Sequence, residues 1–160
     1  MEAALSSVAS WMQTVGYSDW ARFSPLAYPV ANVFHLLGLV MLVGGIGVLD
    51  LRTAGLWRAI PLASLSSALT PIAVVGFFIL AGSGTILFAA DGPSLAASAT
   101  FHLKLILISI ALFNVILFHL LGRRRAADAS EAVPLQRLMA VVSLFLWLSV
   151  ATAGRMIAYS

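Results

Sequence analysis

Four long stretches of apolar residues, separated by short polar connections, dominate this chain of 160 residues. A helix that crosses a bilayer needs roughly 20 predominantly apolar residues, which is about the length of each stretch. The pattern therefore predicts an all-α fold, an integral membrane four-helix up-and-down bundle. Its expected transmembrane helices are Val30 to Val48, Ile72 to Ala90, Leu95 to Leu121, and about Leu135 to Tyr159.

Prolines and turn residues mark the ends of these helices. Pro25 and Pro29 precede the first, where proline is tolerated because the first turn needs no N–H partner. The second can extend back to Pro61 with a kink at Pro71. The sequence Asp91-Gly-Pro-Ser94 predicts a turn, with Ser94 as the N-cap of the third helix.

The N-terminal segment, residues 1–24, has neither the basic start nor the cleavage site of a signal peptide, so we expect it to stay attached. Apolar residues recur there at helical spacing, and aromatic rings suited to the headgroup level accompany them. We predict an N-terminal interfacial amphipathic helix in residues 1–24, followed by the four-helix bundle in residues 25–160. The rings in question are Trp11, Tyr17, Trp20, Phe23 and Tyr28.

Composition supports the membrane class. Hydrophobic residues make up 61% of the chain, charged residues 9%, and the mean hydropathy is +1.03, which excludes an ordinary soluble globule. The absence of cysteine excludes disulfides, thiolate metal sites, iron–sulfur clusters and covalently attached haem. The net charge of +3 forms no extended basic face, so nucleic-acid binding is not expected.

Arginines predict the orientation. Arg52 and Arg58 follow the first apolar stretch, whereas Arg123 to Arg125 and Arg137 lie between the third and fourth. Basic residues concentrate in cytoplasmic loops, so both connections are expected there. The prediction is a multi-pass protein of the bacterial inner membrane with both termini periplasmic.

Two histidines inside apolar stretches are the main chemical signal. The first and third helices of a sequential bundle run in the same direction and lie diagonally across the core. Counting from Pro29 to His35 and from Ser94 to His102 gives depths of about 9 and 12 Å. An ionisable ring inside a bilayer is a functional-site hypothesis, and two at one depth predict axial ligation of one haem b.

Further cofactor-binding residues follow from that hypothesis. Gly38 and Gly45 lie on the same helix face as the first histidine and admit either a macrocycle or a neighbouring backbone. Haem propionates would need cations near the outer surface. The candidates are Lys104, Arg155 and Arg22.

A purely structural interpretation of the two histidines competes with haem binding. His35 can hydrogen-bond a Ser or Thr on an adjacent helix, while His102 reaches toward the interface. Zinc and non-haem iron are disfavoured because no histidine has a carboxylate or second histidine at i+3 or i+4. A copper site using Met41 or Met156 has no support from spacing.

Residues expected in the cytoplasmic half of the bundle are weaker indications of function. His119 lies about 25 Å along its helix from His102 and is expected at the interface, with a quinone hydrogen bond as the second option. Asn114 predicts an interhelical hydrogen bond or part of a substrate or proton path. Asp50 and Arg52 close the first helix with adjacent opposite charges at the cytoplasmic boundary, where we expect a structural role. No catalytic constellation is evident, so the sequence leaves open whether the protein is an enzyme.

The order and spacing of several residues resemble an uncharacterised family of small bacterial four-helix inner-membrane proteins, over nearly the whole chain. The matching features are Tyr28-Pro29, His35-Leu-Leu-Gly38, Gly45, Asp50-Leu-Arg52, Gly55, Pro71, Gly76, Gly82, Phe101-x-x-Lys104, Asn114 and His119. The resemblance implies a membrane bundle and a recurring polar set, but no reaction. His102 lies outside that set, so two-histidine ligation would belong to this chain alone. The implied polar set is His35, Asp50, Arg52, Lys104, Asn114 and His119.

Two functions follow as hypotheses. The first is a haem b electron-transfer subunit that links a periplasmic redox partner and quinone. The alternative is a haem-free structural or accessory subunit of a larger membrane protein complex. Both imply contact with the lipid bilayer and with other membrane or periplasmic subunits. A transporter comes third, because the sequence shows no internal repeat and few charges for a pathway.

Overall fold

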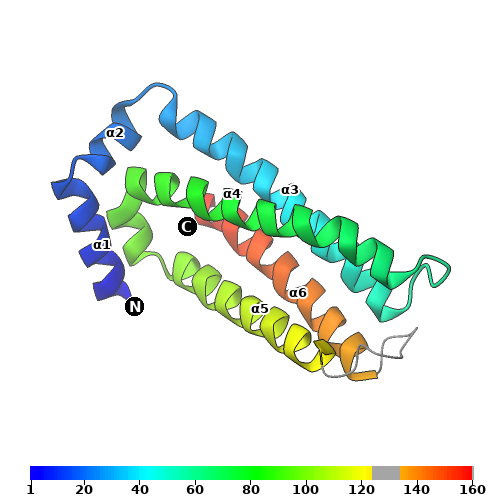
Figure 1. The fold of residues 1–160 in the computed structure, drawn as a ribbon. Helices are drawn as coiled ribbons and strands as arrows, with labels where there is room; N and C mark the ends of the chain where they lie inside the picture. The colour runs from blue at the N-terminus through cyan, green and yellow to red at the C-terminus, as the bar shows by residue number, and fades with distance from the viewer. Residues whose placement is uncertain (124–133, 160) are drawn as a thin grey trace.

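The computed structural model describes residues 1–123 and 134–159, and these residues form helices and no strands (Figure 1). The all-α class is therefore confirmed over the described residues. The helices are α1 (Glu2–Thr14), α2 (Tyr17–Phe23), α3 (Ala27–Ala54), α4 (Leu62–Ala97), α5 (Ala99–Arg123), α6 (Pro134–Met156) and the short 3-10 helix η1 (Ile157–Tyr159).

Four helices in the described part of the chain are long and apolar enough to cross a membrane. They match the four predicted stretches, except that the third helix begins at Ala99 and not at Leu95. Each observed helix extends beyond the predicted bounds at one end or both. The largest extension is in α4, whose 36 residues begin at Leu62 and include Pro71 with helical backbone angles. The prediction of four long apolar helices is confirmed.

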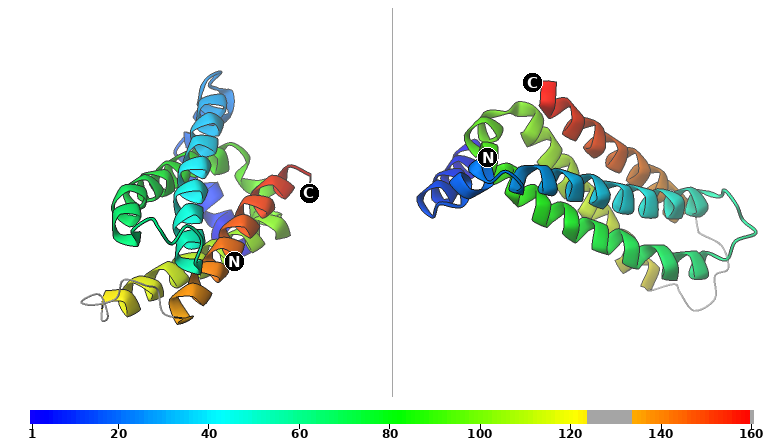
Figure 2. Two further views of the ribbon diagram at one scale, coloured as in Figure 1. Left: turned by 90° about the vertical axis from the view of Figure 1, so that its right-hand side faces the viewer. Right: turned by 90° about the horizontal axis from the view of Figure 1, so that it is seen from above.

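The long helices run alternately up and down (Figures 1 and 2). α3 packs extensively on α4 and on α6, and α6 packs on α5, whereas α4 and α5 barely touch. Both chain termini lie at one end of the arrangement, and the connection between α3 and α4 lies at the other. The bundle is therefore well packed around α3 and loosely closed between α4 and α5.

The N-terminal segment folds as two helices where the sequence predicted one, and its interfacial placement stays a prediction. Gly16 separates α1 from α2 with φ +75°, a left-handed conformation that glycine adopts without steric cost. α1 crosses the end of α4, where a Cβ on Gly92 would lie 2.9 Å from the Cβ of Ala9. From α2, Arg22 donates to the Ala90 carbonyl oxygen through Nε at 3.0 Å and Nη2 at 2.8 Å.

The boundary between α4 and α5 also differs from the prediction. The chain bends at Asp91, with φ −136° and ψ 29°, but continues as helix past Ser94. After this bend Pro93 falls in a first turn, where its missing N–H leaves no intrahelical bond unmade. The break comes at Ser98, whose Oγ accepts a hydrogen bond from the Phe101 amide at 3.3 Å. Ser98, not Ser94, is therefore the N-cap of α5.

Small residues set the contact between α3 and α4. A Cβ on Gly76 would lie 2.7 Å from the Met41 Cβ and 2.8 Å from the Leu42 amide nitrogen. Apolar side chains gain little by leaving lipid, so close backbone approach through small residues is a main source of helix association in a bilayer. The buried cluster beside this contact joins α3, α4, α5 and α6, and consists of Leu42, Ala73, Ala111, Trp147 and Val150.

Candidate functional site

His35 joins α3 to α4. Its Nδ1 lies 3.0 Å from the Oγ of Ser83, a buried residue of α4. The Ser83 hydroxyl donates to the Ile79 carbonyl oxygen at 2.6 Å, so its oxygen is left to accept a hydrogen bond from His35 Nδ1–H. This is the interhelical hydrogen bond that the structural interpretation predicted for His35, and that prediction is confirmed.

His102 has a different partner. It lies in the first turn of α5, where Nε2 is 2.8 Å from the Ala96 carbonyl oxygen. A carbonyl only accepts, so this nitrogen is the donor. Counted from the observed helix starts, His35 is about 12 Å into α3 and His102 only about 5 Å into α5. The equal depths expected from the sequence depended on a helix start at Ser94, which the structure moves to Ser98.

The face beside His35 is already filled. A Cβ on Gly38 would lie 2.8 Å from the Gly76 carbonyl oxygen, and one on Gly45 would lie 3.2 Å from the Ala73 Cβ. Of the two occupants that the glycines could admit, a neighbouring backbone is the one present. As they lie, these residues do not fit a macrocycle. We therefore assign Gly38 and Gly45 to helix packing instead of cofactor binding.

The three predicted propionate partners each contact the protein itself. Arg155 donates through Nη2 to the Tyr159 hydroxyl at 2.7 Å, and its guanidinium lies 5.0 Å from the centre of that ring. Arg22 holds α4 as described above. Lys104 of α5 reaches α6, where its Nζ would lie 3.4 Å from a Cβ on Gly154.

Lys104 also lies close enough to His35 for their charges to interact. Together with Ser83 and Gly154, these residues bring all four long helices together, and we call them the outer cluster. The outer cluster holds a single imidazole and no carboxylate. In residues 1–123 and 134–159, no group of three or more His, Cys, Asp or Glu side chains could hold a metal ion.

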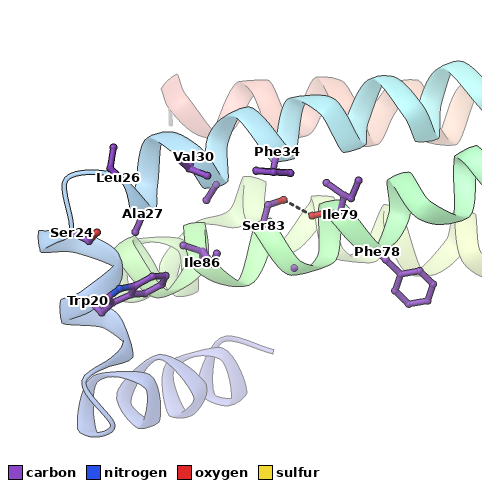
Figure 3. Close-up of a pocket in the computed structure, with 12 residues that line it drawn as sticks. Trp20, Ser24, Leu26, Ala27, Val30, Phe34, Phe78, Ile79, Ser83 and Ile86 are labelled. Carbon is purple, nitrogen blue, oxygen red and sulfur yellow. Dashed lines mark hydrogen bonds between the residues drawn. The ribbon is translucent and has the colours of Figure 1, made fainter.

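A groove in the half of the molecule that holds the N-terminal helices adds no reactive group. It has a volume of about 500 Å³ and lies between α2, α3 and α4. Trp20, Phe34 and Ile86 contribute to its largely apolar wall (Figure 3). Ser83 also lines it, but its hydroxyl is already engaged with Ile79, as the dashed line in Figure 3 shows.

A second cavity lies in the other half of the bundle, and we call it the inner cavity. Its volume is about 400 Å³, and side chains from α3, α4, α5 and α6 line it. It lies where α4 and α5 barely touch. Most of its wall is apolar or aromatic. Its polar side chains are Asp50, Thr53, Ser66, Thr70, Asn114, His119 and Ser143.

Two of these polar side chains form hydrogen bonds with backbone carbonyl groups. Asn114 Nδ2 donates to the Met139 carbonyl oxygen at 3.1 Å, which joins α5 to α6 and confirms the predicted interhelical hydrogen bond. His119 is exposed, and its Nδ1 donates to the Val115 carbonyl oxygen at 2.9 Å. The predicted position of His119 at the membrane interface stays a prediction.

Asp50 and Arg52, the adjacent opposite charges near the end of α3, have different partners. Arg52 turns into the connection between α3 and α4, where it donates to Ile60 O at 2.7 Å and Arg58 O at 3.1 Å. Asp50 instead lines the inner cavity, and its carboxyl group hydrogen-bonds with the Ser143 side chain. Helical periodicity alone could have predicted that Asp50 and Arg52 have different surroundings, because residues two apart on a helix point in different directions.

Comparisons with protein-family models, with curated proteins and with solved structures gave no match. The family resemblance drawn from the sequence therefore stays a prediction.

Proposed function

We propose that this chain is a haem-free accessory subunit of a larger membrane protein complex, embedded in the bilayer by α3 to α6. The observation that carries the proposal is the hydrogen bond between His35 and Ser83, which uses the most suggestive imidazole of the sequence to join two helices. A polar bond of this kind between helices is a common source of association in lipid.

Other polar groups support the same function. Asn114 ties α5 to α6, and Arg22 ties α2 to α4. Arg52 hydrogen-bonds two backbone carbonyl groups of the connection between α3 and α4. Each of these side chains bonds a backbone carbonyl of another segment, which is a structural use of polarity.

The exposure of α5 supports a partner within the membrane. Only 6% of its most apolar window is buried by the rest of the chain, compared with 22% to 28% in the other three long helices. α5 packs extensively on α6 alone. An apolar helix with so little cover from its own chain has a surface that a helix of another subunit can contact.

Site-specific photo-cross-linking in native membranes tests this proposal. A photoreactive residue replaces Phe113 on α5, and the matched control replaces Val40 on α3; both side chains are exposed. We expect a protein adduct at position 113, lipid adducts at position 40, and migration of the tagged chain in an assembly larger than the purified chain alone. Lipid adducts at both positions, with migration as the purified chain, would overturn the accessory function.

The electron-transfer hypothesis stays a prediction from the sequence. Haem b held by His35 and His102 would require His102 to release the Ala96 carbonyl and α3 to separate from α4 near Gly38. We favour the accessory function because it needs neither change.

A further inference from the structure

Two buried polar atoms of residues that line the inner cavity have no hydrogen-bond partner among the described residues. One is Asp50 Oδ2, an acceptor, and the other is Trp147 Nε1, a donor. Buried polar groups in proteins are nearly always paired, so two unpaired groups of opposite kind in one cavity point to a molecule that satisfies both.

One face of α6 connects the residues that carry these atoms. Ser143, which hydrogen-bonds the Asp50 carboxyl group, and Trp147 are four residues apart and share that face. An acceptor and a donor therefore belong to neighbouring parts of the cavity wall. A fitting molecule carries both a donor and an acceptor.

The rest of the wall defines the chemistry of that molecule. Phe77, Phe118 and Trp147 provide aromatic surface, and the volume of about 400 Å³ is within the usual range of small-molecule sites. No Lys or Arg is among the described residues that line the cavity, so the charge of a phosphate would face Asp50 without a counterion. A neutral, flat ring with oxygens at opposite ends fits these constraints.

We propose that the inner cavity binds the head group of a membrane quinol, with one hydroxyl donating to Asp50 Oδ2 and the opposite oxygen accepting from Trp147 Nε1. The side where α4 and α5 barely touch admits this lipophilic molecule from the bilayer. The inference rests on the membrane placement proposed above, but it does not require a partner subunit.

Isothermal titration calorimetry on the detergent-solubilised chain tests the proposal. The probes are decylubiquinol, a short-tailed benzoquinol, and its oxidised form decylubiquinone. We expect saturable binding of the quinol, and weaker binding of the quinone because it has no hydroxyl to donate to Asp50. Trp147→Phe removes the indole N–H together with part of the ring, keeps an aromatic side chain, and should weaken quinol binding about fivefold to tenfold.

Asp50→Asn gives the sharper readout. The new amide donates as well as accepts, so the preference for quinol over quinone should disappear or reverse. Asp91→Asn and Trp57→Phe, which lie outside the cavity wall, should bind like the original chain. Helical circular dichroism and gel filtration confirm that each variant is folded.

Three results would overturn the proposal: no saturable quinol binding, unchanged affinity in folded Trp147→Phe, or displacement of the quinol by dioctanoyl phosphatidylglycerol. The last would show that the cavity takes a phospholipid. Each is distinguishable from failure of the accessory function, because the titration uses the purified chain without a partner.

Discussion

Gly38 and Gly76 face one another across the α3–α4 contact, so closely that a Cβ on Gly38 would lie 2.8 Å from the Gly76 carbonyl oxygen. This approach positions His35 and Ser83 for their hydrogen bond two turns or less away on the same pair of helices. Packing of the two backbones and the polar bond beside it therefore depend on each other.

Gly38→Ala should destabilise the folded chain by about 1–3 kcal/mol, because the new methyl group overpacks a contact made of backbone. Gly44→Ala is the matched control on the same helix, since a Cβ there meets nothing within 4 Å. It should be neutral or stabilising, because alanine has the higher helix propensity. Thermal unfolding in detergent measures both, and equal effects of the two substitutions would contradict the close contact.

Arg22→Ala should loosen the N-terminal helices without unfolding the bundle. The guanidinium makes two hydrogen bonds to the Ala90 carbonyl oxygen, and their loss is expected to cost about 1.5 kcal/mol. Backbone amides of α1 and α2 should then exchange with solvent deuterium roughly tenfold faster. Arg155→Ala, which removes the contact to Tyr159, should leave that exchange unchanged. A uniform effect of Arg22→Ala over all six helices would argue against a local clamp.

Membrane orientation can be measured with single cysteines, because the chain has none of its own. The positive-inside rule places the exposed Ala59 on the cytoplasmic side and the exposed Ser7 on the periplasmic side. In intact cells a membrane-impermeant thiol reagent should label Ser7→Cys and leave Ala59→Cys unlabelled until the cells are opened. The reverse pattern would invert the proposed orientation.

The sequence predicted the four long helices well, because roughly 20 apolar residues have few alternatives to a spanning helix. It predicted the α4–α5 boundary less well. Asp91-Gly-Pro-Ser94 has the composition of a turn, but α1 and Arg22 pack on this segment and it continues as helix to Ala97. Tertiary contacts overrode a local turn signal, and that shift changed the depth expected for His102.

The candidate site shows the same limit. Sequence reasoning found His35, Asn114 and His119 because polar residues stand out in apolar helices. It could not decide whether the Gly38 face admits a cofactor or another helix, since both need the same small residues. Asp50 and Trp147 line one cavity only because α3 and α6 are neighbours. The order of helices around a bundle cannot be predicted from the periodicity of any single helix.

The central claim, that His35 ties helices together and ligates no haem, has one direct measurement. The chain is expressed with sufficient haem and purified in detergent. Oxidised and dithionite-reduced absorption spectra are then recorded with a pyridine haemochrome assay. The account predicts a well-folded, haem-free protein that His35→Ala and Ser83→Ala destabilise to a similar degree, because either change breaks the same bond. A near-stoichiometric haem b spectrum that disappears in a folded His35→Ala variant would contradict it.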